Sequence, residues 1–185
     1  TIPNETTGFE TLFSGIDLKE TKLYFNFEFL ALEPIKKLVA FLKDNKAKAY
    51  LNIDIIGHLT EDGNWYHNLE DDHKIFTELV SLGTSDISII GVDASHYQNA
   101  VANMVQQLAY SLAHANEYLN HIVTSSAVEK SFPLTFKVAV GSNYFFEIAK
   151  IKALRWLWES LASAYGVQSA CNILAIPSKR NKTLY

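Results

Sequence analysis

The sequence predicts an α/β fold in which parallel strands alternate with helices, as in part of a (β/α)8 barrel. Short runs rich in β-branched and aromatic residues recur along the chain, which is typical of strands. Apolar residues at helical spacing lie between these runs. The run 87–93 is almost entirely apolar, as a strand buried on both faces would be. Because a complete barrel needs roughly 250 residues, the 185 residues of this chain predict a partial barrel with about five strands.

The strands are predicted from their composition and from the turn residues that bound each run. They span residues 23–30, 49–56, 87–93, 134–140 and 172–176. Since a helical pattern follows each of the first four, right-handed crossovers would make consecutive strands parallel. No sequence repeat, low-complexity tract or linker divides the chain, so we expect a single domain over residues 1–185.

The helices are predicted from apolar spacing and from suitable residues at their ends. Pro34 suits a first helical turn, Gly83 and Gly166 can end helices, and Ser142 or Asn143 can cap one. The helical patterns cover residues 35–42, 75–80, 101–112 and 145–161. The third pattern continues over residues 116–126, with a possible break between the two parts. The polar and acidic stretch 57–73 is predicted to be a long loop.

Composition excludes several classes of protein. The formal net charge of −4 argues against general nucleic-acid binding. The single cysteine, Cys171, excludes a disulfide within the chain and predicts a reducing, cytoplasmic location. No apolar run approaches the roughly 18 residues that span a bilayer, and no signal peptide opens the chain. The chain starts at Thr1, has Met104 as its only methionine and stops soon after a basic run, so we expect a piece of a longer protein.

The strongest candidate for chemistry is the loop after the third predicted strand, residues 91–100. It holds Asp93, Ser95, His96 and Gln98, in the part of an α/β protein where functional sites usually lie. A neutral imidazole at His96 could donate a hydrogen bond to a substrate carbonyl and polarise it. Alternatively, His96 packs beneath the barrel rim with its ring nitrogens bonded to the backbone, and spacing by itself favours this second interpretation.

Two polar segments are weaker candidates. The stretch from His58 to His73 holds three histidines and several acids, but their spacing matches no known ligand pattern, so no metal site is predicted. Lys179, Arg180 and Lys182 could pair with a phosphate group of a nucleotide-like ligand. A solvated surface turn is the interpretation we prefer for this basic run.

Common catalytic and cofactor motifs are absent from the sequence. It has no phosphate-binding loop, dinucleotide fingerprint, nucleophile elbow or Cys-x-x-Cys pair. A helix rich in aromatic residues has no cofactor spacing and is either core or a surface that packs on another chain. Its aromatic residues are Tyr144, Phe145, Phe146, Trp156 and Trp158.

The stretch 136–161 resembles a segment of the methylmalonyl-CoA mutase family. Its sequence GSNYFFEIAKIKALRWLW (141–158) is similar to the family's run Gly–x–Asn–[FY]–Phe–x–Glu–Ile–Ala–Lys–x–[KR]–Ala–x–Arg–x–Leu–Trp. A less specific similarity covers residues 12–21 and 74–119. The resemblance therefore extends over most of the chain.

This resemblance implies a segment of the barrel that holds an acyl-CoA along its axis. In the family, adenosylcobalamin sits against one face of the barrel and starts a radical rearrangement of the carbon skeleton. A separate C-terminal domain with an Asp-x-His-x-x-Gly motif holds the cobalamin. Asp71 and His73 begin such a motif, but Phe76 stands in place of the glycine. We therefore expect no cobalamin-binding domain and no bound cofactor on this chain.

The catalytic pattern of the family is altered here. Where the family has Tyr-His-x-Gln, this chain retains His96 and Gln98 and has Ser95 in place of the tyrosine. The family's substrate-contacting arginine corresponds to Lys74, which lacks the bidentate fork. The family's Arg-Thr-His after the last strand is missing from residues 175–181. The resemblance thus assigns catalysis to His96 and Gln98, which we expect to be relics, and substrate contact to Lys74 and Ser95.

Three functional hypotheses follow. In the first, the chain is part of the small, non-catalytic subunit of an adenosylcobalamin-dependent methylmalonyl-CoA mutase, and it docks on a catalytic large subunit. In the second, it is a catalytic acyl-CoA mutase barrel with a divergent substrate, using His96 and Gln98 at the thioester. In the third, it is an assembly or binding module that uses the aromatic helix. The first hypothesis predicts a heterodimer, with acyl-CoA as a further ligand, and little or no isomerase activity in this chain alone.

Overall fold

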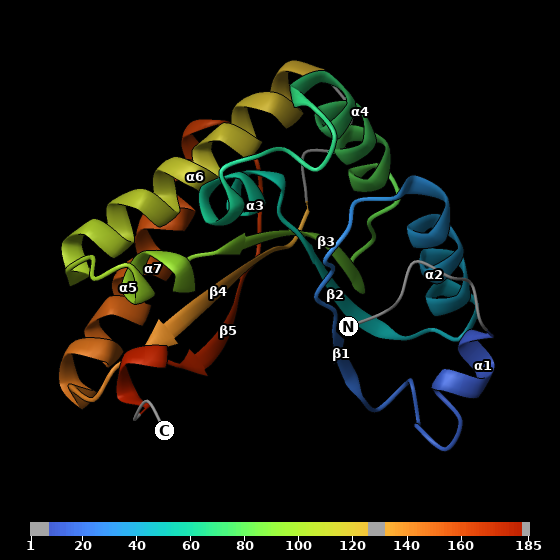
Figure 1. Ribbon diagram of the computed structural model, residues 1–185, viewed down its shortest axis with the longest axis horizontal. Coiled ribbons are helices and arrows are strands. Elements are labelled where there is room, and N and C mark those ends of the chain that lie inside the picture. The colour runs from blue at the N-terminus through green and yellow to red at the C-terminus, as the bar shows by residue number, and fades with distance from the viewer. Residues whose placement is uncertain (1–7, 126–131, 183–185) are drawn as a thin grey trace. The chain divides into compact units, whose positions relative to one another are not determined.

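The structure, a computed structural model, describes residues 8–125 and 132–182 (Figure 1). Within these ranges the strands are β1 (Lys22–Tyr24), β2 (Lys48–Ile53), β3 (Ile87–Asp93), β4 (Leu134–Val140) and β5 (Cys171–Pro177). The helices are α1 (Phe9–Leu12), α2 (Leu32–Asp44), α3 (Ile55–Asp62), α4 (Leu69–Val80), α5 (Ser95–Asn99), α6 (Met104–Ser125), α7 (Tyr144–Ala164) and the 3-10 helix η1 (Lys179–Asn181). Residue 126, where one predicted helix ends, lies outside the described residues.

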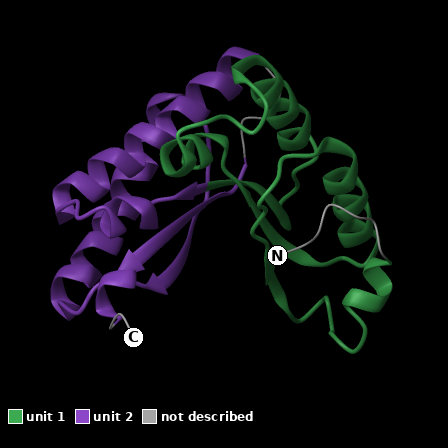
Figure 2. Cartoon of the chain, in the orientation of Figure 1, with its two compact units in different colours: residues 1–91 green, residues 92–185 purple. Residues whose placement is uncertain are grey.

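The chain forms two compact units, residues 1–91 and residues 92–185, which Figure 2 colours separately. In the first unit, β2 pairs in parallel with β1 and with β3. In the second unit, β4 and β5 pair in parallel along their whole length. Parallel strands that alternate with helices confirm the predicted fold class, an α/β segment of the partial (β/α)8 type.

The core of the first unit lies beneath α2 and α4. Helix α2 buries an apolar stripe at helical spacing, formed by Ile35, Leu38, Val39 and Leu42. Such a stripe turns one face of the helix toward the core. Phe76 of α4 is fully buried, and Lys36 Nζ lies 3.2 Å from Glu78 Oε2, so an ion pair links the two helices at the surface.

The core of the second unit lies between β4 and α7. Trp158 is fully buried, and its ring packs edge-on against Phe136 with 5.4 Å between the ring centroids. The indole N–H of Trp158 donates to the carbonyl of Ser169 at 3.2 Å, which satisfies the buried donor. At the end of α7, the Tyr165 hydroxyl bonds to Asn116 and Asn120 of α6.

The first predicted strand is wrong beyond Tyr24. It was predicted to reach residue 30, but β1 ends at Tyr24. Asn52 of β2 adopts a left-handed backbone with φ of 52°, and its side-chain amide donates to the Phe25 carbonyl at 3.0 Å. The pairing register of β2 is irregular at this point. Beyond it, the rings of Phe25, Phe27 and Phe29 contact one another in sequence, so side-chain packing overrides strand propensity.

The predicted loop over residues 57–73 is also wrong, because α3 and α4 occupy much of it. Asp54 ends β2 before the predicted residue 56 and caps α3 with its side chain. Gly63 closes α3 with a left-handed φ of 81°. Asn68 caps α4, and three acidic residues in the first turn of α4 interact favourably with the positive end of the helix dipole.

The predicted helices 101–112 and 116–126 form one helix, α6, which continues to Ser125 without a break. Its start was predicted wrongly, since α6 begins at Met104 and the short helix α5 precedes it. No helix within residues 8–125 and 132–182 is both long enough and apolar enough to cross a membrane.

Val101 occupies a strained position at the end of α5. The Val101 N–H donates to the Gln98 carbonyl and the Ala102 N–H donates to the Tyr97 carbonyl, both at 3.0 Å. This pair of bonds closes a helix with one left-handed residue, which is usually glycine. Val101 holds that position with φ of 71° and is 70% exposed. A β-branched side chain is costly in this conformation.

We predict that Val101→Gly raises the free energy of unfolding by about 1 kcal/mol, because glycine relieves the left-handed strain. The change removes little buried surface, since the valine is mostly exposed. Val101→Ala removes the branch but keeps the Cβ, so it is the matched control and should be stabilised less than the glycine variant. Urea unfolding followed by circular dichroism measures the difference, and a glycine variant no more stable than the alanine variant would contradict the prediction.

Candidate functional site

The candidate site lies in the second unit, where β3 ends and α5 begins. Asp93 is the last residue of β3 and stands between Lys137 of β4 and His96 of α5. Lys137 Nζ lies 2.7 Å from Asp93 Oδ2, and His96 Nε2 lies 3.4 Å from the same oxygen. The other carboxylate oxygen accepts hydrogen bonds from the backbone N–H and the hydroxyl of Ser95. The loop is therefore organised around Asp93.

The partial burial of this cluster strengthens its ion pair. The side chains of Asp93 and Lys137 are mostly covered, so water screens their attraction less than on an open surface. Both carboxylate oxygens of Asp93 are engaged within the protein, which gives this residue an organising role. His96 is 22% exposed and has its ring beside a carboxylate, an arrangement that orients an imidazole. His96 thus lies partly exposed beside the pair formed by Asp93 and Lys137.

Gln98, the second residue assigned to catalysis, is held inside the protein. Its side chain is 5% exposed, and its Oε1 accepts a hydrogen bond from Lys150 Nζ at 3.0 Å. On the other side, a Cβ placed on Gly141 would lie 3.1 Å from Gln98 Nε2. The amide group therefore lies between Lys150 and the backbone at Gly141.

Lys150 of α7 is the centre of this interior network. Its buried Nζ also donates to Gln107 Oε1 at 3.0 Å and to the Ala139 carbonyl at 2.8 Å. Glu147, one turn earlier in α7, supplies the opposite charge at 2.6 Å, and its other oxygen accepts from the Gly141 N–H at 2.9 Å. Burying an ammonium group is costly unless it is paired and hydrogen-bonded. The network meets that requirement and joins α5, α6, β4 and α7.

The four predicted site residues do not all lie in the same unit. Ser95, His96 and Gln98 lie in α5 of the second unit, whereas Lys74 is an exposed residue of α4 in the first unit. Ser95 is buried, and its hydroxyl is used by Asp93. The roles of Lys74 and Ser95 in substrate contact stay predictions.

The histidines and acids of residues 58–73 build a local structure. The buried carboxylate of Asp72 accepts from the backbone N–H groups of Tyr66 and His67, and it lies 2.8 Å from His67 Nδ1. Burial, with a contribution from the charge of Asp54, raises the pKa of Tyr66 to about 12. Across residues 8–125 and 132–182, no group of three or more His, Cys, Asp or Glu side chains could hold a metal ion.

The basic run forms the exposed turn η1. The Arg180 N–H donates to Ser178 Oγ, and the Lys179 N–H donates to Asn99 Oδ1, each at 3.2 Å. The side chains of Lys179, Arg180 and Lys182 are exposed. The backbone N–H groups thus fix the turn while its basic side chains stay exposed. This agrees with the preferred interpretation, a solvated surface turn.

Cys171 is poorly suited to nucleophilic chemistry. Burial raises the pKa of its thiol to about 11, and the nearby positive charge of Arg155 opposes this shift only in part. Since the thiolate is the reactive form, Cys171 is almost entirely unreactive thiol near neutral pH.

Sequence reasoning missed the two lysines that organise the site. Lys137 interrupts an otherwise mostly apolar strand, LTFKVAV, and Lys150 belongs to a buried i, i+4 series in α7. A charged residue among buried neighbours needs a partner, and that pattern was the available signal. Glu147, three residues before Lys150, could have been identified from helical spacing.

Comparisons with known proteins agree on one family. The model of the methylmalonyl-CoA mutase family matches residues 4–179. A methylmalonyl-CoA mutase small subunit from Porphyromonas gingivalis is 37% identical over 82 residues, which are 43% of this chain and 13% of that protein. A small subunit from Streptomyces virginiae is 31% identical over 133 residues, 71% of this chain and 21% of that protein. The large subunit from Porphyromonas gingivalis is 31% identical over 94 residues, 50% of this chain and 13% of that protein.

The matched part of this chain is a small portion of each of these relatives, at most 21% of their length. The relatives named small subunit and large subunit in Porphyromonas gingivalis are both similar to it.

We predict that Lys150→Met lowers the free energy of unfolding by about 3–5 kcal/mol, because it leaves the charge of Glu147 without its ion-pair partner and three acceptors without their donor. Lys152→Met, on the exposed side of the same helix, is the control and should change stability by less than about 0.5 kcal/mol. Glu147→Gln added to Lys150→Met should recover part of the loss. Urea unfolding measures all three, and equal effects at positions 150 and 152 would refute the role of the network.

Alkylation tests the environment of Cys171. At pH 8, iodoacetamide should modify Cys171 at least about a hundredfold more slowly than the thiol of a short peptide, because of its raised pKa. The rate should rise about tenfold per pH unit toward pH 10. In denaturing urea the two rates should become equal. Mass spectrometry follows the reaction, and peptide-like rates in the folded protein would count against the burial of this thiol.

Proposed function

The chain belongs to the methylmalonyl-CoA mutase family, and from that premise we propose that it is a barrel segment of the small, non-catalytic subunit of an adenosylcobalamin-dependent methylmalonyl-CoA mutase. Its role is to dock on a catalytic large subunit, and the heterodimer interconverts methylmalonyl-CoA and succinyl-CoA in the cytoplasm. Residues 1–185 are part of one barrel domain that holds no cobalamin.

The observation that carries this proposal is the state of Gln98. The resemblance assigns it to catalysis, yet its carbonyl oxygen accepts from Lys150 and its side chain is enclosed. An amide whose oxygen is already bonded and whose side chain is 5% exposed is poorly placed to accept a hydrogen bond from a substrate. The ion pair between Asp93 and Lys137 supports the proposal as well. These two charged groups lie beside His96 and bind each other.

Adenosylcobalamin is the cofactor of the family, and the partial Asp-x-His motif of this chain does not fit it. The partial motif at Asp71 and His73 lies within α4, where His73 Nδ1 is 2.8 Å from the Leu69 carbonyl of the same helix. Phe76, at the place of the motif's glycine, is fully buried in the core of the first unit. We therefore assign the cofactor to the large subunit, and no step of the reaction is assigned to it on this chain.

A catalytic acyl-CoA mutase barrel with a different substrate is the second candidate. His96 favours it, because its ring keeps some exposure and lies beside the carboxylate of Asp93. In that function His96 would donate a hydrogen bond to the thioester carbonyl. The small-subunit role is preferred because it accounts for Gln98 as well as for His96.

We expect the full-length protein that contains this chain to form a heterodimer with the large mutase subunit of the same organism. Size-exclusion chromatography with light scattering detects the complex, and an assay with added adenosylcobalamin detects turnover. The mixture should convert methylmalonyl-CoA, while the protein without the large subunit should not. Turnover by the protein alone, or failure to form any complex, would overturn the proposed function.

His96→Ala serves as the second arm of this experiment. In the active mixture it should leave kcat within about twofold, whereas loss of a working catalytic histidine typically lowers the rate by about a hundredfold or more. A loss of that size, with an unchanged circular dichroism spectrum and unchanged complex formation, would favour the divergent catalytic barrel.

A further inference from the structure

Helix α7 carries large apolar side chains on its outer face as well as on its inner face. Its inner face buries Leu154, Trp158 and Ala162 at helical spacing. Its outer face carries Phe145 and Trp156, which are 80% and 73% exposed. A helix on the surface of a globular protein normally presents polar residues on the side away from the core, and a helix that is apolar all round is normally covered all round. The packing of the second unit therefore leaves the outer face of α7 unexplained.

The outer residues lie on one line along the helix. From Phe145, the steps to Ala149, Lys152 and Trp156 are four, three and four residues, which place these side chains on one face. At 1.5 Å per residue, the line from Phe145 to Trp156 is about 16 Å long. The apolar surface is thus a continuous strip with one charge inside it.

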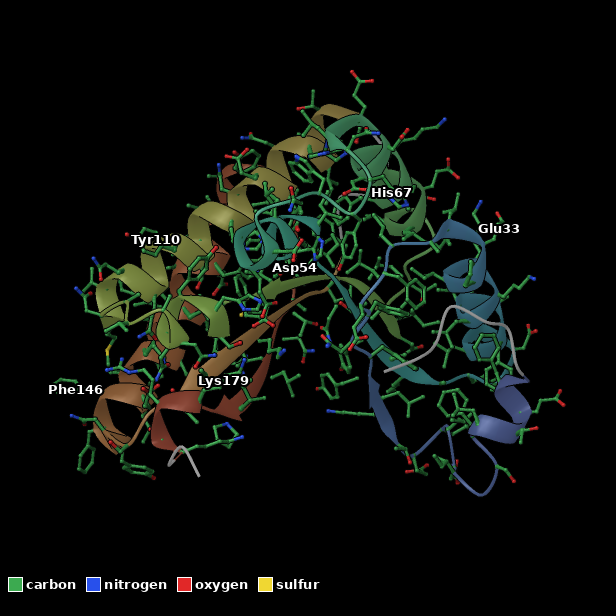
Figure 3. All side chains as sticks on the ribbon, in the orientation of Figure 1. Glu33, Asp54, His67, Tyr110, Phe146 and Lys179 are labelled. Atoms are coloured by element: carbon green, nitrogen blue, oxygen red, sulfur yellow. The ribbon has the colours of Figure 1, made fainter. Side chains whose placement is uncertain are left out.

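Residues at the start of α7 widen this line into a patch. The aromatic patch, as we define it, consists of Tyr144, Phe145, Ile148 and Trp156. Tyr144 is 70% exposed, and its ring lies 5.5 Å from that of Phe145, centroid to centroid. Phe146 is 58% exposed but lies on the other flank of the helix, outside the patch, and Figure 3 shows it pointing away from the ribbon at the N-terminal end of α7. Taking about 200 Å² for an aromatic side chain, the patch exposes on the order of 500 Å². Each partner in a stable complex buries about 800 Å², so the patch is large enough to form the centre of an interface.

We propose that the aromatic patch is the surface on which the large mutase subunit docks, an inference that rests on the proposed function. Aromatic residues gathered at the centre of a surface, with charges around them, are the composition expected of the energetic centre of an interface. Arg155 and Glu159 are exposed residues of the same helix and supply charges for the rim.

The position of Lys152 favours a different chain, and not a second copy of this chain, as the protein that binds the aromatic patch. It is exposed and lies between Phe145 and Trp156 on the outer line. If α7 paired with itself antiparallel across a twofold axis so that Phe145 met Trp156, the two Lys152 side chains would approach each other near the axis. Like charges at the centre of an interface are unfavourable. A different subunit can instead offer an acidic side chain to Lys152, with apolar pockets on either side for the aromatic rings.

Calorimetric titration of the full-length protein with the large subunit tests this surface. Phe145→Ser and Trp156→Ser should each weaken the affinity at least tenfold, as truncation of a central aromatic residue does. Lys152→Glu should weaken it as well, because it would place like charges together. Val105→Ser is the matched control, since Val105 is an equally exposed apolar residue of α6 in the same unit. The Val105→Ser variant should bind the large subunit with an affinity within about twofold of wild type.

Thermal unfolding and light scattering of each variant without the large subunit separate docking from folding. The midpoints should equal that of wild type, because the altered side chains are exposed. A midpoint many degrees lower would mean that the patch is covered within its own protein, and a homodimer dissociated by Phe145→Ser would mean a second copy. Either result overturns the proposal, as does wild-type affinity in both serine variants. Absence of any binding by the wild-type protein would instead overturn the proposed function itself.

Discussion

The burial of Lys150 is the constraint on which the second unit depends. An ammonium group inside a protein needs a countercharge and acceptors for its protons, and it is destabilising without them. The chain meets this need with Glu147 from the same helix, Gln98 from α5, Gln107 from α6 and the Ala139 carbonyl from β4. One side chain thereby connects four elements. The same network includes Gln98, so the interaction that organises this unit also holds a residue predicted for the candidate site.

Asp93 is a second charged residue whose partners come from the protein, and it lies closer to the surface than Lys150. Its carboxylate is bonded to Lys137 and to Ser95, and it lies beside His96 at the end of β3. Charged and polar groups at the end of a barrel strand often serve catalysis. Here both carboxylate oxygens of Asp93 are used within the cluster. A site that keeps its shape while its groups bond to one another is consistent with a subunit that supports another subunit's chemistry.

Helix α7 contributes to both the buried network around Lys150 and the exposed surface of the second unit. Its inner face positions Lys150 and Trp158, while its outer face carries the aromatic patch. A rigid helix with a well-packed inner face presents its outer side chains in fixed positions, which lowers the entropic cost of binding. The residues that hold the candidate site together and the residues proposed to hold the partner therefore lie on opposite sides of one element.

The sequence by itself determined the strands over 87–93 and 134–140, because strands covered on both faces are marked by nearly continuous apolar runs. It did not determine the segment 57–73, since the same polar residues serve loops and helix caps. Tertiary structure alone decided the state of the site. Gln98 and Lys150 are 52 residues apart, and Asp93 and Lys137 are 44 apart. Contacts between such distant residues leave no local periodicity, so only the folded chain brings each charge to its partner.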